Sequence, residues 1–195
     1  AGSISHRYPI ADGDTKSNAS IQVSKLELQE ATEEMALLLT NNGCDVILLE
    51  MMYRPERMKI IFDIVKKLNI PIWVCFSCRK SDKGEILSLT DETVVPFFEF
   101  IVISKEYNFV AWGIMHTSDD ILGECIKMIK DNFNRPILAY PDTGGWISPN
   151  WIFDSVIDPE KFKEKANGWF ALGAQIIGGC CGTSPDHIRA LATLK

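Results

Sequence analysis

The stretch AQIIGGCCGTSP, residues 174–185, places a cysteine pair between an apolar segment and the start of a helix. Its apolar residues 174–177 predict a buried strand, and Ser184-Pro185 is typical of a helix cap followed by the first helical residue. Cys180 and Cys181 have Cα atoms ~3.8 Å apart, whereas a disulfide usually needs about 4.4–6.8 Å. Two thiolates that follow two flexible glycines can instead bind one soft metal ion. The alternative is that two small apolar side chains fill a turn.

Strand-like and helix-like segments alternate along the rest of the chain. Because the strand-like runs are continuously apolar, they favour a parallel sheet that is covered on both faces. Polar residues 117–120 and Asp158 are expected to cap two of the helices. The predicted strands are 1–5, 46–49, 70–76, 109–114, 136–140 and 174–177. The predicted helices are 20–41, 55–68, 92–105, 119–133, 159–172 and 185–194.

This alternation predicts an α/β fold, either an open doubly wound sheet or a (β/α)8 TIM barrel. No G-x-G-x-x-G motif follows any strand, so the dinucleotide-binding fingerprint of the open sheet is missing. A complete barrel has eight strands and about 250 residues. We therefore expect residues 1–195 to form a single, incomplete barrel domain without the first two strands, a fragment of a longer protein. The barrel is favoured by chemically active residues that follow several different strands: Glu50, Ser77, His116, Asp142 and the cysteine pair.

Composition narrows the class of partner. The chain of 195 residues carries a net charge of −6, which argues against nucleic acid or an anionic membrane as a partner. No apolar stretch approaches the ~20 residues that span a bilayer, and no secretory signal pattern is visible. Six cysteines without such a signal are typical of reduced thiols or metal ligands. We expect a cytoplasmic protein that acts on small molecules.

Residues 178–191, GGCCGTSPDHIRAL, resemble the C-terminal signature of the homocysteine S-methyltransferase family. Members of this family are zinc-dependent (β/α)8 barrels that methylate a thiol. Further segments resemble its elements in the same order: AGSIS (1–5) its third strand, CDVILLEMM (44–52) its fourth, PIWVCFSC (71–78) with GEILSLTDET (84–93) its fifth strand and the following loop, WGIMHTSDD (112–120) its G-I/V-N-C-S/T motif, and AYPDTGG (139–145) its Y-P-N-S/T-G turn.

The resemblance implies a zinc site. Cys180 and Cys181 match two of the family's three zinc thiolates, and the third position is His116, preceded by Met115 instead of asparagine. Histidine is a competent zinc ligand, and a Cys2His site with one open position is a known catalytic arrangement. A neutral imidazole makes the site one negative charge poorer, so a bound substrate thiolate would be held more tightly and would be a weaker nucleophile. The alternative is a capping or surface histidine.

The resemblance also implies a substrate site. Glu50 matches the glutamate that helps to hold the substrate ammonium, although a salt-bridged structural glutamate is an alternative. Met51 could line a pocket for a thioether or methylene chain, or belong to the core. Asp142, followed by Thr143, either forms a tight turn or orients a ligand.

The implied function is a zinc-dependent S-methyltransferase that moves a methyl group from a sulfonium, betaine or folate donor to homocysteine and yields methionine. The implied partners are therefore a thiol substrate and a methyl donor. A catalytically silent zinc-binding or scaffold member of the family and a zinc hydrolase are the alternatives. The open edges of an incomplete barrel also predict self-association.

The remaining cysteines and one histidine have structural interpretations. Cys75 and Cys78 form a C-x-x-C, but side chains i and i+3 of a strand point to opposite faces, so core packing is favoured. Cys44 and Cys125 have no visible partners, and His187 is expected to pack on the last helix.

Overall fold

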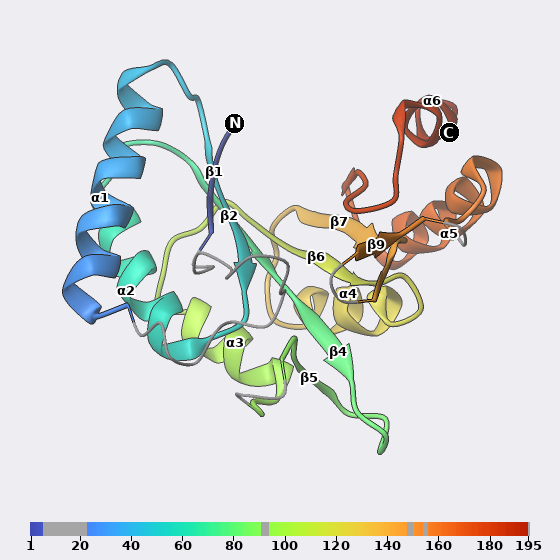
Figure 1. Ribbon diagram of the computed structural model, residues 1–195, viewed down its shortest axis with the longest axis horizontal. Helices are drawn as coiled ribbons and strands as arrows, with labels where there is room; N and C mark the ends of the chain where they lie inside the picture. The colour runs from blue at the N-terminus through green and yellow to red at the C-terminus, as the bar shows by residue number, and fades with distance from the viewer. Residues whose placement is uncertain (6–22, 91–93, 148–149, 154–155, 195) are drawn as a thin grey trace.

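A six-stranded parallel sheet forms the centre of the molecule in this computed structural model (Figure 1). The structure describes residues 1–5, 23–90, 94–147, 150–153 and 156–194. Each strand pairs with the next in the order β1-β2-β3-β6-β7-β10, and every pair is parallel. The strands are β1 (Gly2–Ser5), β2 (Ile47–Met52), β3 (Ile72–Phe76), β6 (Ala111–Ser118), β7 (Ile137–Asp142) and β10 (Ile176–Ile177).

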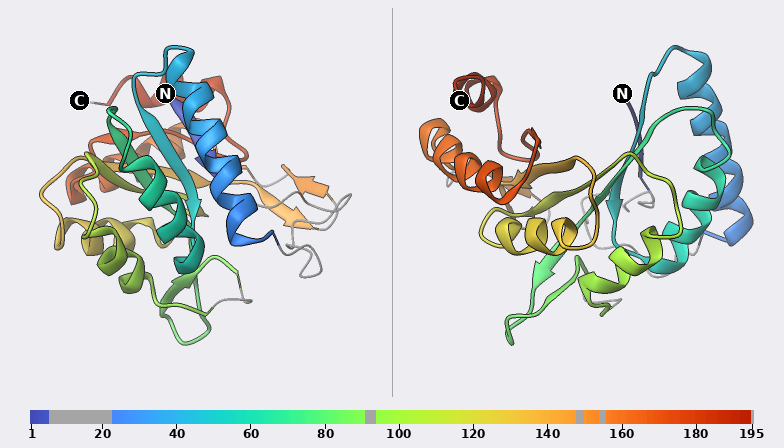
Figure 2. Two further views of the ribbon diagram at one scale, coloured as in Figure 1. Left: turned by 90° about the vertical axis from the view of Figure 1, so that its left-hand side faces the viewer. Right: turned by 180° about the vertical axis from the view of Figure 1, so that it is seen from behind.

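The helices follow one another around the outside of this sheet (Figure 2). Because the strand order never reverses, right-handed crossovers place each helix on the same face. A doubly wound sheet reverses its strand order at a switch point and covers both faces, so that alternative is wrong here. The helices are α1 (Lys25–Asn41), α2 (Pro55–Val65), α3 (Phe97–Ser104), α4 (Leu122–Lys130), α5 (Pro159–Leu172) and α6 (Pro185–Leu191).

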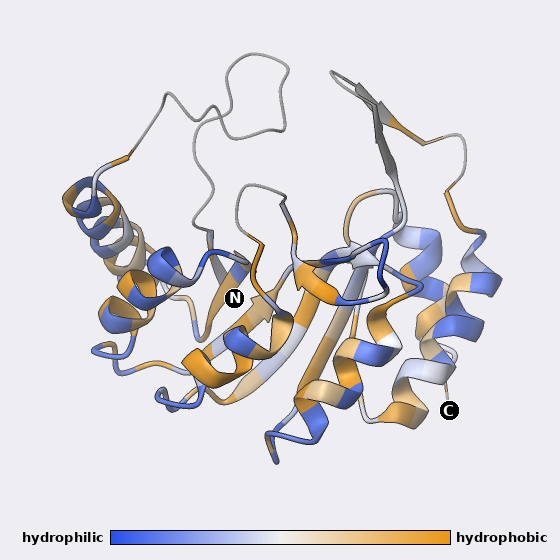
Figure 3. Cartoon of the chain, turned by 90° about the horizontal axis from the view of Figure 1, so that it is seen from below, coloured by the Kyte–Doolittle hydropathy of each residue, from blue (hydrophilic) through white to orange (hydrophobic). Residues whose placement is uncertain are grey.

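The core lies between the sheet and these helices. Apolar residues follow the strands and the helix sides that face them, and hydrophilic residues lie outside (Figure 3). Phe97 and Phe100 of α3 contact each other edge to face, and both rings contact Phe76 of β3. Burial of large aromatic side chains of this kind is a major stabilising contribution. None of the helices in the described part of the chain is long and apolar enough to cross a membrane.

Helix α5 has the predicted bounds, and the Asp158 side chain caps it by accepting hydrogen bonds from the N–H groups of Glu160 and Lys161. The predicted cap at residues 117–120 is wrong. Strand β6 continues through Ser118, and α4 begins only at Leu122 without a side-chain cap. Residues 20–22 and 92–93 of two predicted helices lie outside the described residues.

Two short antiparallel hairpins were not expected from the sequence. One pairs β4 (Cys78–Lys80) with β5 (Ile86–Ser88), and the other pairs β8 (Gly145–Ile147) with β9 (Asn150–Ile152). Each follows a strand of the main sheet, β3 or β7 respectively. Because three-residue strands carry almost no periodicity, a search for apolar runs does not detect them.

Candidate metal centre

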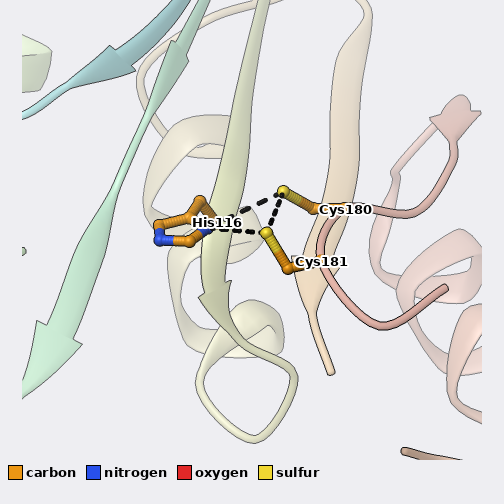
Figure 4. A group of neighbouring side chains, drawn as sticks. All are labelled: His116, Cys180 and Cys181. Carbon is orange, nitrogen blue, oxygen red and sulfur yellow. Dashed lines mark hydrogen bonds between the residues drawn. The ribbon is translucent and has the colours of Figure 1, made fainter. Parts of the chain in front are cut away.

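Three soft donors converge at one end of the sheet (Figure 4). His116 lies in β6, and Cys180 and Cys181 lie in the loop between β10 and α6. The Nδ1 atom of His116 is 3.7 Å from the Sγ atom of each cysteine, and the two Sγ atoms are 3.8 Å apart. Among the described residues, this is the one group of three or more His, Cys, Asp or Glu side chains close enough to bind a common metal ion.

The triangle of donor atoms fits a tetrahedral zinc site. With Zn–S bonds of about 2.3 Å and Zn–N bonds of about 2.0–2.1 Å, tetrahedral angles place two sulfurs about 3.8 Å apart and a sulfur and a nitrogen about 3.6 Å apart. The observed separations are 3.8 Å and 3.7 Å. The three side chains therefore need little rearrangement to bind one ion.

The cysteine loop is held on the end of β7 by backbone hydrogen bonds. The N–H of Cys180 donates to the carbonyl of Pro141 at 3.1 Å. The N–H groups of Thr143 and Gly144 donate to the carbonyl of Cys181 at 2.9 and 3.1 Å. The turn after β7 thus fixes the backbone of both cysteines, and their side chains need only to rotate.

Two glycines that flank the cysteine pair are required because neighbouring atoms lie too close to them for a side chain. Gly182 has a φ of +84°, and a Cβ atom there would lie 2.7 Å from the N atom of Gly144. A Cβ atom on Gly179 would lie 2.2 Å from Oγ1 of Thr183, whose hydroxyl donates to the carbonyl of Cys180 at 2.7 Å. The packing of this loop therefore explains Gly179 and Gly182 of the GGCCGT sequence.

His116 reaches the site because β6 is irregular there. It has a φ of 43°, a left-handed conformation that is uncommon for any residue except glycine. The pairing of β6 with β7 shifts between Met115 and Ser118, which is a β-bulge. The predicted end of this strand at residue 114 is therefore wrong, and His116 lies inside the strand.

Asp142 touches His116 at the end of β7. Its Oδ2 atom is 3.4 Å from Nδ1 of His116, and its Oδ1 atom accepts a hydrogen bond from the N–H of Gly144 at 2.9 Å. Both carboxylate and imidazole are 17% exposed. Burial raises the pKa of the Asp142 carboxyl, against the lowering effects of His116 and the Gly144 N–H. Asp142 thus forms the predicted turn, and its carboxylate also contacts His116.

Glu50 lies in β2 and is half-buried. Its two carboxylate oxygens accept hydrogen bonds from the hydroxyl of Ser3 and, at 3.1 Å, from the hydroxyl of Tyr140. Of the residues that the structure describes, none forms a salt bridge with Glu50. The pKa of the Cys180 thiol is raised mainly by burial, and the negative charges of Asp142 and Glu50 add smaller contributions.

Comparison with known proteins identifies the family. The homocysteine S-methyltransferase family model matches residues 1–194. The chain belongs to the homocysteine S-methyltransferase family. It is 25% identical over 189 residues to "Homocysteine S-methyltransferase 1" of Arabidopsis thaliana, an alignment that covers 94% of this chain and 56% of that protein. It is 27% identical over 186 residues to "Homocysteine S-methyltransferase YbgG" of Bacillus subtilis, with coverage of 94% and 56%.

Solved structures support the fold. The apo form of the homocysteine methyltransferase MmuM from Escherichia coli superposes with a TM-score of 0.71 at 20% identity, over 98% of this chain and 60% of that chain. Its metallated form superposes with a TM-score of 0.69 at 22% identity, over 87% and 52%. The predicted TIM-barrel fold is confirmed, and the chain covers part of the barrel. It spans about half the length of the curated relatives it matches.

In this member of the homocysteine S-methyltransferase family, the surroundings of the two thiols favour their protonated form when no metal is bound. Burial raises the pKa of both, and that of Cys181 rises to about 12. The nearby Asp142 carboxylate raises both pKa values further. A bound cation would reverse this effect, because it stabilises the thiolate form.

Several other residues singled out from the sequence are buried. Met51 is 7% exposed and belongs to the core. It lies at a second β-bulge, in β2, and has a φ of 57°. Strand β2 therefore passes beyond the predicted end at residue 49. Cys75 and Cys78 are buried, as expected for core positions. His187 helps to cap α6, because its Nδ1 accepts from the N–H of Ser184 while its Nε2 lies 2.8 Å from the carbonyl of Ile157.

Sequence reasoning missed the hydroxyl partners of Glu50. Ser3 and Tyr140 are 47 and 90 residues away from it along the chain. The available signal was Tyr140, a residue with a polar tip near the end of a predicted strand, where barrel sites lie.

A cavity of about 720 Å³ opens beside the donors. His116 and Asp142 lie on its wall, together with Arg79 and Lys80 of the β4–β5 hairpin and Asp119 of the loop before α4. The first hairpin thus has a role, because it forms one side of this cavity.

Proposed function

We propose that this chain forms the metal and substrate site of a zinc-dependent S-methyltransferase, which moves a methyl group from a sulfonium, betaine or folate donor to homocysteine and yields methionine. The observation that carries the proposal is the triangle of Cys180, Cys181 and His116, whose edges match a tetrahedral zinc site. The printed names of the related proteins support the choice of homocysteine as the acceptor.

Each residue of the site has a role in this proposal. Cys180, Cys181 and His116 would hold the zinc ion. When bound, zinc supplies a Lewis acid that lowers the pKa of a substrate thiol. The Asp142 carboxylate lies 3.4 Å from Nδ1 of His116, so it would place a negative charge beside the bound ion. Glu50, oriented by two hydroxyl donors, offers its remaining lone pairs to the substrate ammonium.

The cavity beside His116 provides room for the methyl donor. Displacement at a methyl group needs the donor in line with the attacking sulfur. Residues of both charges line the cavity: Arg79 and Lys80 of the hairpin, and Asp119 of the loop before α4. It therefore supports binding of a charged donor close to the metal-binding side chains.

A methyl-transfer assay tests the proposed function. The zinc-loaded protein is incubated with homocysteine and, in separate reactions, with S-methylmethionine, betaine or a methylated folate, and methionine is measured by mass spectrometry. We expect methionine to form with one of these donors. A protein that binds one zinc ion but forms methionine with none of them contradicts the proposal and favours the silent family member. Release of acid from ester or amide substrates would favour the zinc hydrolase.

Glu50→Gln should raise the KM for homocysteine. Loss of a hydrogen bond to a charged group typically costs about 1.5–3 kcal/mol, which corresponds to a roughly 10- to 100-fold weaker interaction. The measurement is the KM of wild-type and variant for homocysteine and for 4-mercaptobutanoate, which lacks the amino group. The variant should lose affinity for homocysteine alone. An equal loss for both thiols would show that Glu50 does not recognise the ammonium.

Zinc affinity should rise steeply with pH. Because the pKa of Cys180 is raised and that of Cys181 is about 12, both thiols carry a proton at pH 6–8 and must lose it to bind metal. The apparent affinity should therefore increase roughly 10- to 100-fold per pH unit in this range. Calorimetry in buffers of different ionisation enthalpy counts the released protons. We expect the wild-type protein to release two protons per bound zinc ion and Cys181→Ser to release one. A wild-type protein that releases no proton would contradict the thiolate site.

A further inference from the structure

The carbonyl group of Met115 accepts two side-chain hydrogen bonds directly before His116. The hydroxyl of Ser77, at the end of β3, donates to it at 3.0 Å, and the hydroxyl of Thr117 donates at 2.8 Å. Ser77 is 0% exposed and Thr117 is 2% exposed. We call these two hydroxyls on the Met115 carbonyl the hydroxyl clamp.

The hydroxyl clamp connects the bulge of β6 to the neighbouring strand. Oγ1 of Thr117 also accepts a hydrogen bond from the N–H of Cys78 at 2.9 Å, so this hydroxyl is both donor and acceptor. The Ser77 hydroxyl also lies 3.4 Å and 3.3 Å from the sulfurs of Met51 and Met115. Thioether sulfur is a weak acceptor, so the Met115 carbonyl is the preferred partner of this single O–H.

The sheet itself does not hold the bulge in place. Met115 pairs with Tyr140 and Ser118 pairs with Asp142, so two residues of β6 stand opposite Pro141 alone. Proline has no N–H to donate to the ladder. The left-handed φ of 43° at His116 therefore needs support from other groups.

We propose that Ser77 and Thr117 are positioning residues for the metal centre. The hydroxyl clamp fixes the peptide plane between Met115 and His116. With this peptide plane fixed, the φ angle of His116 determines where its imidazole ring lies. The Nδ1 atom of the ring is then 3.7 Å from both sulfurs. Without the clamp the bulge is free to relax toward regular strand geometry, which would turn the imidazole away from the cysteines.

Cobalt binding tests this inference, because Co(II) substitutes for zinc and its visible absorption reports the number of sulfur and nitrogen ligands. Ser77→Ala and Thr117→Val should each weaken Co(II) binding by at least about tenfold, the range seen when groups that orient a metal ligand are lost. They should also change the shape of the visible spectrum. Thr117→Ser keeps the hydroxyl and should retain the wild-type affinity and spectrum.

Ser104→Ala is the matched control. Ser104 is also 0% exposed, and its hydroxyl donates to the carbonyl of Ile101 and accepts from Trp112, away from the metal centre. Its loss should lower the melting temperature and leave Co(II) binding unchanged. Ser77→Ala or Thr117→Val proteins that fold and bind Co(II) with the wild-type affinity and spectrum would overturn the inference.

The wild-type protein provides a test that needs no variant. If the hydroxyl clamp favours metal binding, metal binding must stabilise the clamp to the same extent. Hydrogen exchange of the Cys78 amide, which donates to Thr117, should therefore slow when zinc is added; an unchanged rate contradicts the inference.

The inference builds on the zinc site of the proposed function, but its readouts do not depend on methyl transfer. A protein with these metal-binding results and no methyl transfer would contradict the proposed function alone.

Discussion

Replacing Cys181 by serine should reduce the zinc content of the purified protein from about one ion per chain to a small fraction of that. The bound ion would lose one of only two thiolates, and a neutral serine hydroxyl is a poor substitute for a soft anionic ligand. Because structural zinc sites bind with apparent free energies of about 10–16 kcal/mol shared among a few ligands, an affinity loss of at least about 10³-fold is expected. Cys180→Ser should behave in the same way, and metal analysis with chelator competition measures both.

The controls for this experiment separate the ligand role from general damage. Cys44→Ser changes a half-buried cysteine outside the donor triangle and should leave zinc content unchanged. His116→Ala should also lower zinc affinity, because it removes the third donor at 3.7 Å from both sulfurs. Full retention of zinc by His116→Ala would contradict the three-ligand site and leave the cysteine pair alone as the metal-binding element.

Gly182→Ala should both destabilise the protein and weaken metal binding. A Cβ atom in the left-handed region costs about 1–2 kcal/mol, and overpacking typically adds about 1–3 kcal/mol. Here the added atom would lie 2.7 Å from the backbone N of Gly144 and 2.9 Å from Oγ1 of Thr143. To avoid this contact the cysteine loop must move from the turn that donates two hydrogen bonds to the Cys181 carbonyl.

Gly43→Ala provides the comparison for this variant. Gly43 has nearly the same φ, +86°, but a Cβ atom there would meet nothing within 4 Å. The Gly43→Ala protein should therefore lose only the stability that the left-handed conformation costs, and it should keep the wild-type zinc affinity. Urea unfolding of both variants, together with zinc competition, separates the two contributions. Equal losses of stability and no loss of zinc affinity in Gly182→Ala would show that the loop is not packed as described.

The sequence was informative where structure depends on neighbouring residues. The apolar runs locate the parallel strands, and Asp158-Pro159 locates the start of α5, because burial and capping have local signatures. The bulges at Met51 and His116 have no such signature. Both residues lie where the pairing with a neighbouring strand shifts, and the carbonyl of Met115, directly before His116, accepts a hydrogen bond from Ser77.

The candidate site divides in the same way. The motif around Cys180 and Cys181 and the order of the motifs pointed to His116 as their neighbour, and the structure brings these three side chains together. The contacts that orient Glu50 come from Ser3 and Tyr140, which belong to different strands and follow no spacing rule. The contact between Asp142 and His116 depends on the bulge, so only the folded sheet could reveal it.

The consecutive order of the strands has a consequence for how the protein reaches its native state. Because each strand of the six-stranded sheet pairs with the preceding strand of that sheet, the sheet can grow by adding one strand and its helix at a time. The donors His116 and Cys180 are separated by 64 residues, and Glu50 lies further back still. The three metal donors can thus come together only after β6, β7 and the loop beyond β10 have met. Metal uptake therefore reports the docking of this loop on the end of β7, which is a contact between segments distant in the sequence.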